Sequence, residues 1–101
     1  TLYVRDGDDV VLVHFCASGH HPKMRARDTG GDRVAFDFDG AINFDPAKAG
    51  HMHDASFTFH GPDELITRWQ FWDNGKPSEH VANLHLKRVV IEPMELVDPP
   101  R

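Results

Sequence analysis

Histidine is unusually frequent in this chain, with 8 among 101 residues. The imidazole ring titrates near neutral pH and is the commonest metal ligand in proteins. A chain this rich in histidine can therefore build a metal site, a proton-transfer site or polar contacts to a ligand. The densest run is Gly50-His51-Met52-His53. If this run forms a strand, His51 and His53 share one face, because side chains alternate along a strand.

Two histidines on one face could supply two ligands of a zinc site, with a third from His14, His80 or the thiolate of Cys16. The chain has no HExxH motif and no CxxC pair that would specify such a site. Zinc or haem bound at His51 and His53 therefore stays one hypothesis. The alternatives are that His51 caps a long loop by hydrogen bonding, and that His53 is a satisfied polar residue or a polar contact to an organic ligand.

His14 and Cys16 are also two residues apart, which is compatible with a nucleophile and its base. Cysteine is as often a small buried apolar residue, and no oxyanion-hole element is recognisable. We therefore expect binding in preference to catalysis. The adjacent His20 and His21 precede Pro22 in a loop, where we expect them to be solvated.

The bulk composition is that of one globular domain, with 40% hydrophobic and 27% charged residues. The net charge is −5 with histidine neutral, and no Lys/Arg run is longer than Lys87-Arg88, which argues against a nucleic-acid surface. No apolar run is long enough for a membrane helix. With Cys16 alone, no intrachain disulfide forms; this fits the cytoplasm and does not exclude the periplasm.

The patterning predicts an all-β domain over residues 1–101, an antiparallel up-and-down meander of about seven strands. Strands are expected over Leu2–Arg5, Val10–Cys16, Lys23–Arg27, Arg33–Asp39, Met52–His60, Glu64–Trp72 and Ser78–Val90. Asn74-Gly75 is the strongest hairpin signal, typical of a type I′ turn. The tail, residues 91–101, could add a short edge strand. Seven strands are few for a closed barrel, so we expect a partial barrel or one completed by dimerisation.

Hairpin geometry predicts which side chains share the inner face. A two-residue Asn74-Gly75 turn sets Trp69 opposite His80, and the preceding turn sets His53 opposite Phe71. His60 and His85 then point outward. The expected inner, ligand-binding surface consists of His14, Cys16, Met24, Phe36, Phe38, His53, Phe57, Trp69, Phe71 and His80.

Several motifs resemble those of an uncharacterised family of bacterial lipocalin-like (calycin-type) β-barrel proteins. These are His14-Phe15-Cys16, Pro22-Lys23-Met24-Arg25, Gly50-His51-Met52-His53 and Trp69-Gln70-Phe71, spread over nearly the whole chain. The resemblance implies a barrel of about ten strands with an interior cavity, its first strands lying before Thr1. A fold resemblance alone does not fix function.

The leading functional expectation is a protein that binds a small hydrophobic molecule in an interior lined by histidines and aromatic rings. Two alternatives remain. One is a metal- or haem-binding protein, with possible enzymatic activity, that uses inward histidines. The other is a structural or oligomerisation module in which two copies form a homodimer.

Overall fold

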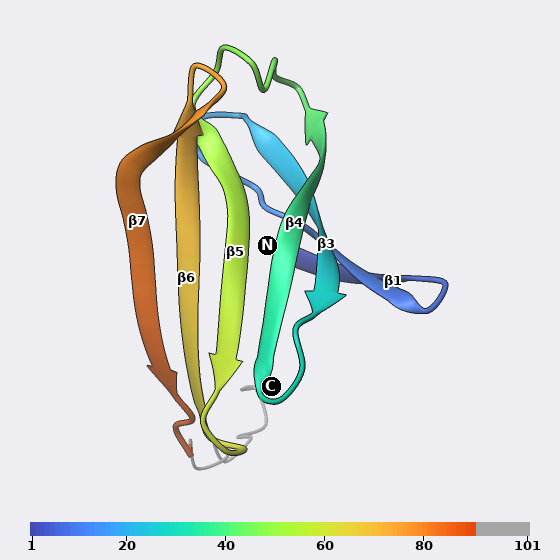
Figure 1. Ribbon diagram of the computed structural model, residues 1–101, viewed down its shortest axis with the longest axis vertical. Helices are drawn as coiled ribbons and strands as arrows, with labels where there is room; N and C mark the ends of the chain where they lie inside the picture. The colour runs from blue at the N-terminus through green and yellow to red at the C-terminus, as the bar shows by residue number, and fades with distance from the viewer. Residues whose placement is uncertain (91–101) are drawn as a thin grey trace, which may run out of the picture.

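The chain forms one antiparallel sheet in a computed structural model, which describes residues 1–90 (Figure 1). The sheet has seven strands and the described residues contain no helix. The strands are β1 (Leu2–Asp6), β2 (Asp9–Val13), β3 (His21–Asp28), β4 (Arg33–Ile42), β5 (His51–Phe59), β6 (Glu64–Asp73) and β7 (Lys76–Lys87). The predicted all-β meander of seven strands is confirmed. The edge strand considered for residues 91–101 lies outside the described residues.

Each strand pairs with its neighbour in sequence, in the order β1-β2-β3-β4-β5-β6-β7. The β6–β7 connection is the two-residue turn that Asn74-Gly75 predicts. Both residues have positive φ, 52° for Asn74 and 73° for Gly75, as a type I′ turn requires. Among residues 1–90, no helix is long and apolar enough to cross a membrane.

The sheet curls strongly, bringing strands that are not paired into contact. Tyr3 of β1 lies four strands from Phe57 of β5, or about 19 Å in a flat sheet with strands about 4.8 Å apart. Their ring centroids are 6.2 Å apart. The ring of His14, which follows β2, lies 5.4 Å from that of Trp69 on β6. The face carrying these contacts, here called the inner face, is therefore concave.

The core lies on this inner face. Side chains from five strands form one buried apolar cluster, Leu12, Met24, Phe36, Ala55, Phe57 and Trp69. Leu12 and Met24 are both fully buried. No helix or second sheet covers this face within residues 1–90. These side chains are therefore buried by the strands of the curled sheet itself.

The curl does not close the sheet. β1 and β7 each pair with one neighbour only, so both present a free edge within the described residues. The Cα radius of gyration is 17.1 Å, against about 13 Å for a compact domain of this length. The expected partial barrel is therefore confirmed as an open, curled sheet.

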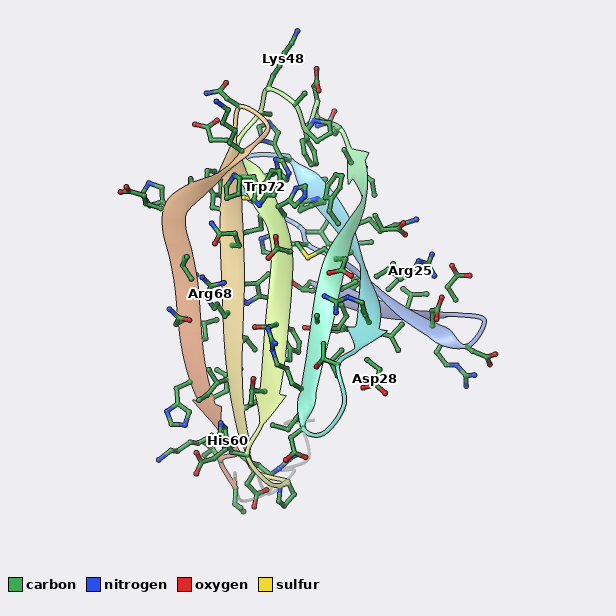
Figure 2. The ribbon with its side chains drawn as sticks, viewed as in Figure 1. Arg25, Asp28, Lys48, His60, Arg68 and Trp72 are labelled. Atoms are coloured by element: carbon green, nitrogen blue, oxygen red, sulfur yellow. The ribbon has the colours of Figure 1, made fainter. Side chains whose placement is uncertain are left out.

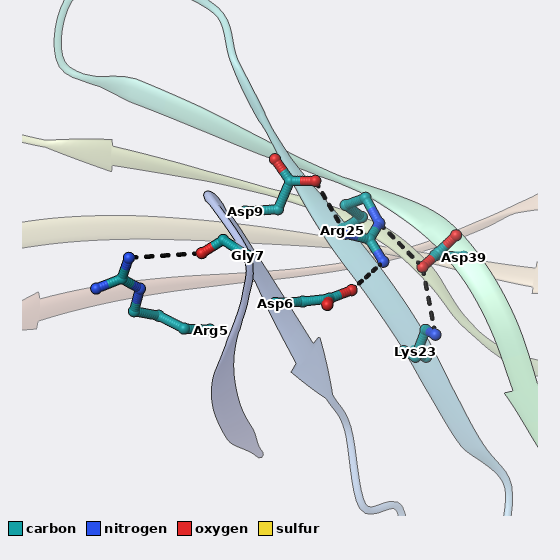
Figure 3. A network of polar contacts seen from close by, with 7 residues as sticks. All are labelled: Arg5, Asp6, Gly7, Asp9, Lys23, Arg25 and Asp39. Atoms are coloured by element: carbon teal, nitrogen blue, oxygen red, sulfur yellow. Dashed lines mark hydrogen bonds and ion pairs between the residues drawn. The ribbon is translucent and has the colours of Figure 1, made fainter.

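A cluster of charges ties the β1–β2 hairpin to the rest of the sheet (Figure 3). The Arg25 guanidinium on β3 contacts Asp6 at 2.9 Å, Asp9 at 3.0 Å and Asp39 at 3.2 Å. These carboxylates raise the pKa of Arg25 further above its usual range. Lys23 adds a contact of 3.4 Å to Asp39. The turn end of this hairpin projects past β3 and β4 in Figure 1, and Arg25 contacts both of its strands there.

Two bulges change the strand register that the turns alone predict. In β7, extra residues near Ser78 set Trp69 opposite Ala82 and not opposite His80. In β5, the register shifts between Met52 and Asp54, so that Met52 and not His53 lies opposite Phe71. Hairpin counting assumes an unbroken ladder, and a bulge inserts residues that the count does not see.

The curl buries some leucines of the inner face and leaves others half-exposed. Changing one leucine of each kind to alanine tests this difference. Leu12→Ala should lower the free energy of unfolding by about 2–5 kcal/mol, because Leu12 is fully buried and its loss leaves a cavity. Leu84→Ala, on a side chain that is 50% exposed, should change it by about 0.5 kcal/mol or less. Urea denaturation measures both. Equal losses would mean that the core is not centred on the curl.

Candidate functional site

The structure brings together part of the predicted inner surface. Met24, Phe36, Phe57 and Trp69 belong to the buried cluster. His14 lies beside Trp69 at its rim and contacts the Thr1 hydroxyl through Nδ1 at 3.1 Å. Burial lowers the pKa of His14, so this ring is neutral at pH 7.

Besides His14 at the rim, five predicted residues lie outside this buried cluster: Cys16, Phe38, His53, Phe71 and His80. Cys16 is exposed in the loop after β2, where hydrogen bonds from Ser18 lower its thiol pKa. His80 is exposed on β7, and its ring lies edge-on to that of Phe71, with centroids 6.1 Å apart. The predicted approach of His53 and His80 is wrong, because the two bulges move both residues out of register.

His53 does not point to the inner face. The bulge places it with the residues of the opposite, outer face, where it lines a cleft together with Ser56 and Arg68. The predicted inward orientation of His53 is therefore wrong. Phe38 lies opposite the buried Met24 in the β3–β4 register, on the predicted inner face, and its ring also contacts His53. Pairing between β4 and β5 extends only over residues 33–36 and 55–58, so the strands separate beyond that point.

Aromatic rings fill the separation between β4 and β5. The ring of His53 lies between Phe38, at 4.4 Å and 10° from parallel, and Trp72, at 3.8 Å and 15°. His51 lies against the edge of this stack, 5.1 Å from His53. His51 is only 3% exposed. Both faces of His53 are therefore covered, and only its ring edge is available for polar contacts.

The two histidines form a directed hydrogen-bond chain. His51 Nδ1 lies 2.9 Å from the carbonyl oxygen of Ala49, which can only accept, so this nitrogen carries the proton. In the neutral ring His51 Nε2 is then an acceptor, and His53 Nδ1 donates to it at 2.9 Å. His53 Nε2 is left as a free acceptor. The tautomers follow from these partners.

The surroundings keep His53 neutral. Burial, followed by the neighbouring His51, lowers its pKa to about 4. Its Nε2 makes no hydrogen bond and is not among the buried unpartnered atoms of residues 1–90, so it reaches solvent at the cleft. Trp72 Nε1, in contrast, is buried without a hydrogen bond of normal geometry. It lies close enough to Asp54 to lower that carboxyl's pKa, which burial raises.

His20 and Phe44, which the sequence alone does not place in a site, also contact the segment around Gly50 and His51. His20 is half-buried, bonds through Nδ1 to the Gly50 carbonyl at 3.0 Å and lies 5.4 Å from the Phe44 ring. Phe44 in turn contacts His51 at 4.8 Å. His21 is half-buried beside Phe15. The expectation that His20 and His21 are solvated is wrong: His20 bonds to the β4–β5 connection, and His21 is the first residue of β3, paired with Ile42. His60 and His85 are exposed, as predicted.

The cleft beside His53, here called the outer cleft, has a volume of about 420 Å³. Its lining consists of Arg27, Arg33, Ala35, Asp37, Phe38, His53, Asp54, Ala55, Ser56, Arg68 and Trp72. Figure 2 shows Arg68 and Trp72 along β6, with His60 at the far end of the sheet. Three arginines and two aspartates give it a formal charge of +1 with His53 neutral, in a chain of net charge −5.

A second hollow, here called the inner pocket, lies on the concave face and has a volume of about 530 Å³. Its walls are mainly apolar and come from four strands: Val10, Ala26, Val34, Phe36, Phe57 and Phe59. Asp8, Asp9, Asp28, Gly31 and Arg33 line its remainder.

Within residues 1–90 no three His, Cys, Asp or Glu side chains are arranged to hold a metal ion. His51 has both ring nitrogens occupied, by Ala49 and by His53. The zinc and haem hypotheses therefore stay predictions from sequence. Comparisons with protein-family models, curated proteins and solved structures found no match to this chain. The lipocalin-like resemblance likewise stays a prediction.

The low pKa of His53 predicts how stability depends on pH. The unfolded chain protonates this ring as the pH falls through about 6.5, and the folded chain only near 4, so stability is lost between these values. If the whole pKa difference acted on stability, the free energy of unfolding would fall by about 3 kcal/mol. Because solvent screens the partly exposed ring, we expect a loss of about 1–2 kcal/mol.

His53→Gln should therefore show a smaller loss of unfolding free energy than the wild type between pH 7 and pH 4, measured by urea denaturation at each pH. His60→Gln, the same change at an exposed histidine, is the matched control and should follow the wild type. A His53 variant that loses stability as steeply as the wild type would contradict the buried, neutral ring.

Proposed function

We propose that the protein binds a small hydrophobic molecule in the inner pocket. The observation that carries this proposal is an apolar hollow of about 530 Å³ on the concave face, a volume in the range of small-molecule sites. Its floor is formed by Phe36 and Phe57, whose rings lie 4.9 Å apart. Because both are buried in the core, the floor is preformed, and a ligand needs little rearrangement to bind.

The exposed part of the pocket wall supplies the driving force. Phe59 is 43% exposed and Val10 is 39% exposed, although both lie on the apolar face. A hydrophobic ligand would remove this surface from water, at about 25 cal/mol per Å² of apolar area. The aspartates and Arg33 around the pocket can meet a polar end of the ligand.

Binding is testable with N-phenyl-1-naphthylamine, an uncharged probe whose fluorescence rises in apolar surroundings. Titration should show saturable binding, and Phe59→Ser should weaken it by about 5–10-fold, because a half-exposed aromatic wall is lost. Phe15→Ser is the matched control: this phenylalanine is 54% exposed and does not line the pocket, so its loss should leave the affinity unchanged. Equal effects of both variants, or no saturable binding, would contradict the proposal.

Edge-strand pairing with a second copy of the chain is a second candidate, favoured by β7. This strand has 12 residues and, within residues 1–90, pairs on one side only. Leu84 and Leu86 on it are 50% and 48% exposed. Long unpaired edges with apolar side chains are templates for pairing with another strand.

A β7-paired homodimer predicts a solution mass of two chains in sedimentation equilibrium. Leu86→Lys, which puts a charge into the apolar stripe of the edge, should shift the mass to one chain. Val4→Lys makes the same change on the other edge strand, at a residue that is 53% exposed, and should leave the dimer intact. A single-chain mass for the wild type at the highest soluble concentration would rule this pairing out.

A further inference from the structure

We propose that the outer cleft is a second binding site, for a small organic carboxylate that also carries a hydroxyl group. Arg68 would bind the carboxylate, and His53 Nε2 would accept the hydroxyl proton. This site lies on the face opposite the inner pocket, and the proposal does not depend on ligand binding there.

Two arginines of the cleft, Arg33 and Arg68, form no ion pair among residues 1–90, and Arg68 lies nearer to His53 in the strand register. Arg27 is held by Asp37 through contacts of 2.8 and 3.3 Å. Arg68 forms no ion pair among residues 1–90; it lies near enough to Asp54 to lower that group's pKa but not within contact distance. Guanidinium groups recognise carboxylates through paired N–H donors, so Arg68 is equipped for an anionic group.

The other end of the cleft has an acceptor fixed in position. His53 cannot rotate freely, because Phe38 and Trp72 cover its two faces and His51 holds its Nδ1. The hydrogen-bond chain from Ala49 leaves Nε2 without a proton. A neutral acceptor of fixed direction selects ligands with an O–H donor, since a ligand without one leaves no partner for it.

The spacing of the two groups suits a short, extended molecule. Arg68 lies opposite Ser56 in the β5–β6 register, three residues along β5 from His53, or about 10 Å. Trp72, beside His53, favours an aromatic group at that end of the cleft. Asp54 lines the cleft between His53 and Ser56, and burial raises the pKa of its carboxyl. The volume of about 420 Å³ accommodates a single ring with its substituents.

The test compares 4-hydroxyphenylacetate with two analogues that each lack one group. Phenylacetate lacks the hydroxyl, and the methyl ester of 4-hydroxyphenylacetate lacks the charge. Calorimetry should show 4-hydroxyphenylacetate binding at least about 10-fold more tightly than the ester and several-fold more tightly than phenylacetate. The ¹⁵N resonance of His53 Nε2 should shift with the first probe only.

Variants assign each contact. Arg68→Gln, at an exposed residue that should fold normally, should weaken binding of 4-hydroxyphenylacetate by about 10-fold or more and leave N-phenyl-1-naphthylamine binding unchanged. Arg5→Gln, at an exposed arginine of β1 outside the cleft, is the matched control and should bind as the wild type does. His53→Phe keeps an aromatic ring between Phe38 and Trp72 but removes the acceptor, so it should bind 4-hydroxyphenylacetate and phenylacetate equally.

The proposal is overturned if 4-hydroxyphenylacetate does not bind saturably, if its ester binds as tightly, or if Arg68→Gln and Arg5→Gln behave alike. If His53→Phe fails to fold, the His53 ¹⁵N shift in the wild-type protein decides the role of that ring. No shift on adding 4-hydroxyphenylacetate would exclude His53 as the acceptor.

Discussion

Burial of one apolar face by a single sheet is the constraint on which the rest of this structure depends. No helix or second sheet covers the core within residues 1–90, so the sheet has to curl until its own strands meet. Tyr3 contacts Phe57, and His14 contacts Trp69, in each case between elements four places apart in the strand order. These contacts bend the sheet around the buried Leu12 and Met24. The Arg25 charge cluster holds the hairpin that completes this curvature.

The curl also determines where the hollows lie. On the concave side it leaves an apolar pocket, lined in part by half-exposed side chains such as Phe59. On the convex side strongly curved strands separate, and β4 and β5 stop pairing beyond Phe36 and Ala55. The aromatic stack around His53 fills that separation. Two hollows of opposite character, one apolar and one charged, thus follow from one bend.

Histidine has several separate roles in this molecule. His51 is structural, buried with both nitrogens bonded, while His53 presents a free nitrogen to the outer cleft. His20 ties the loop after β2 to Gly50, and His85 bonds to Glu64 at the surface. Only the His51–His53 pair combines burial, a fixed tautomer and access to a cleft. The density of histidine in the sequence therefore overstates the size of any one site.

The sequence by itself determined the strands, their order and the turn at Asn74-Gly75, because alternation and turn residues act over a few neighbours. It also identified Met24, Phe36, Phe57 and Trp69 as members of one inner face, and His51-Met52-His53 as a place of interest. Only the tertiary structure decided which way His53 points. A one-residue bulge in β5 shifts the pairing with β6, so the residues beyond it face the side opposite to the one that an unbroken strand predicts. It alone placed Phe38 against His53 and gathered the arginines of the outer cleft, because these contacts depend on the curl of the whole sheet.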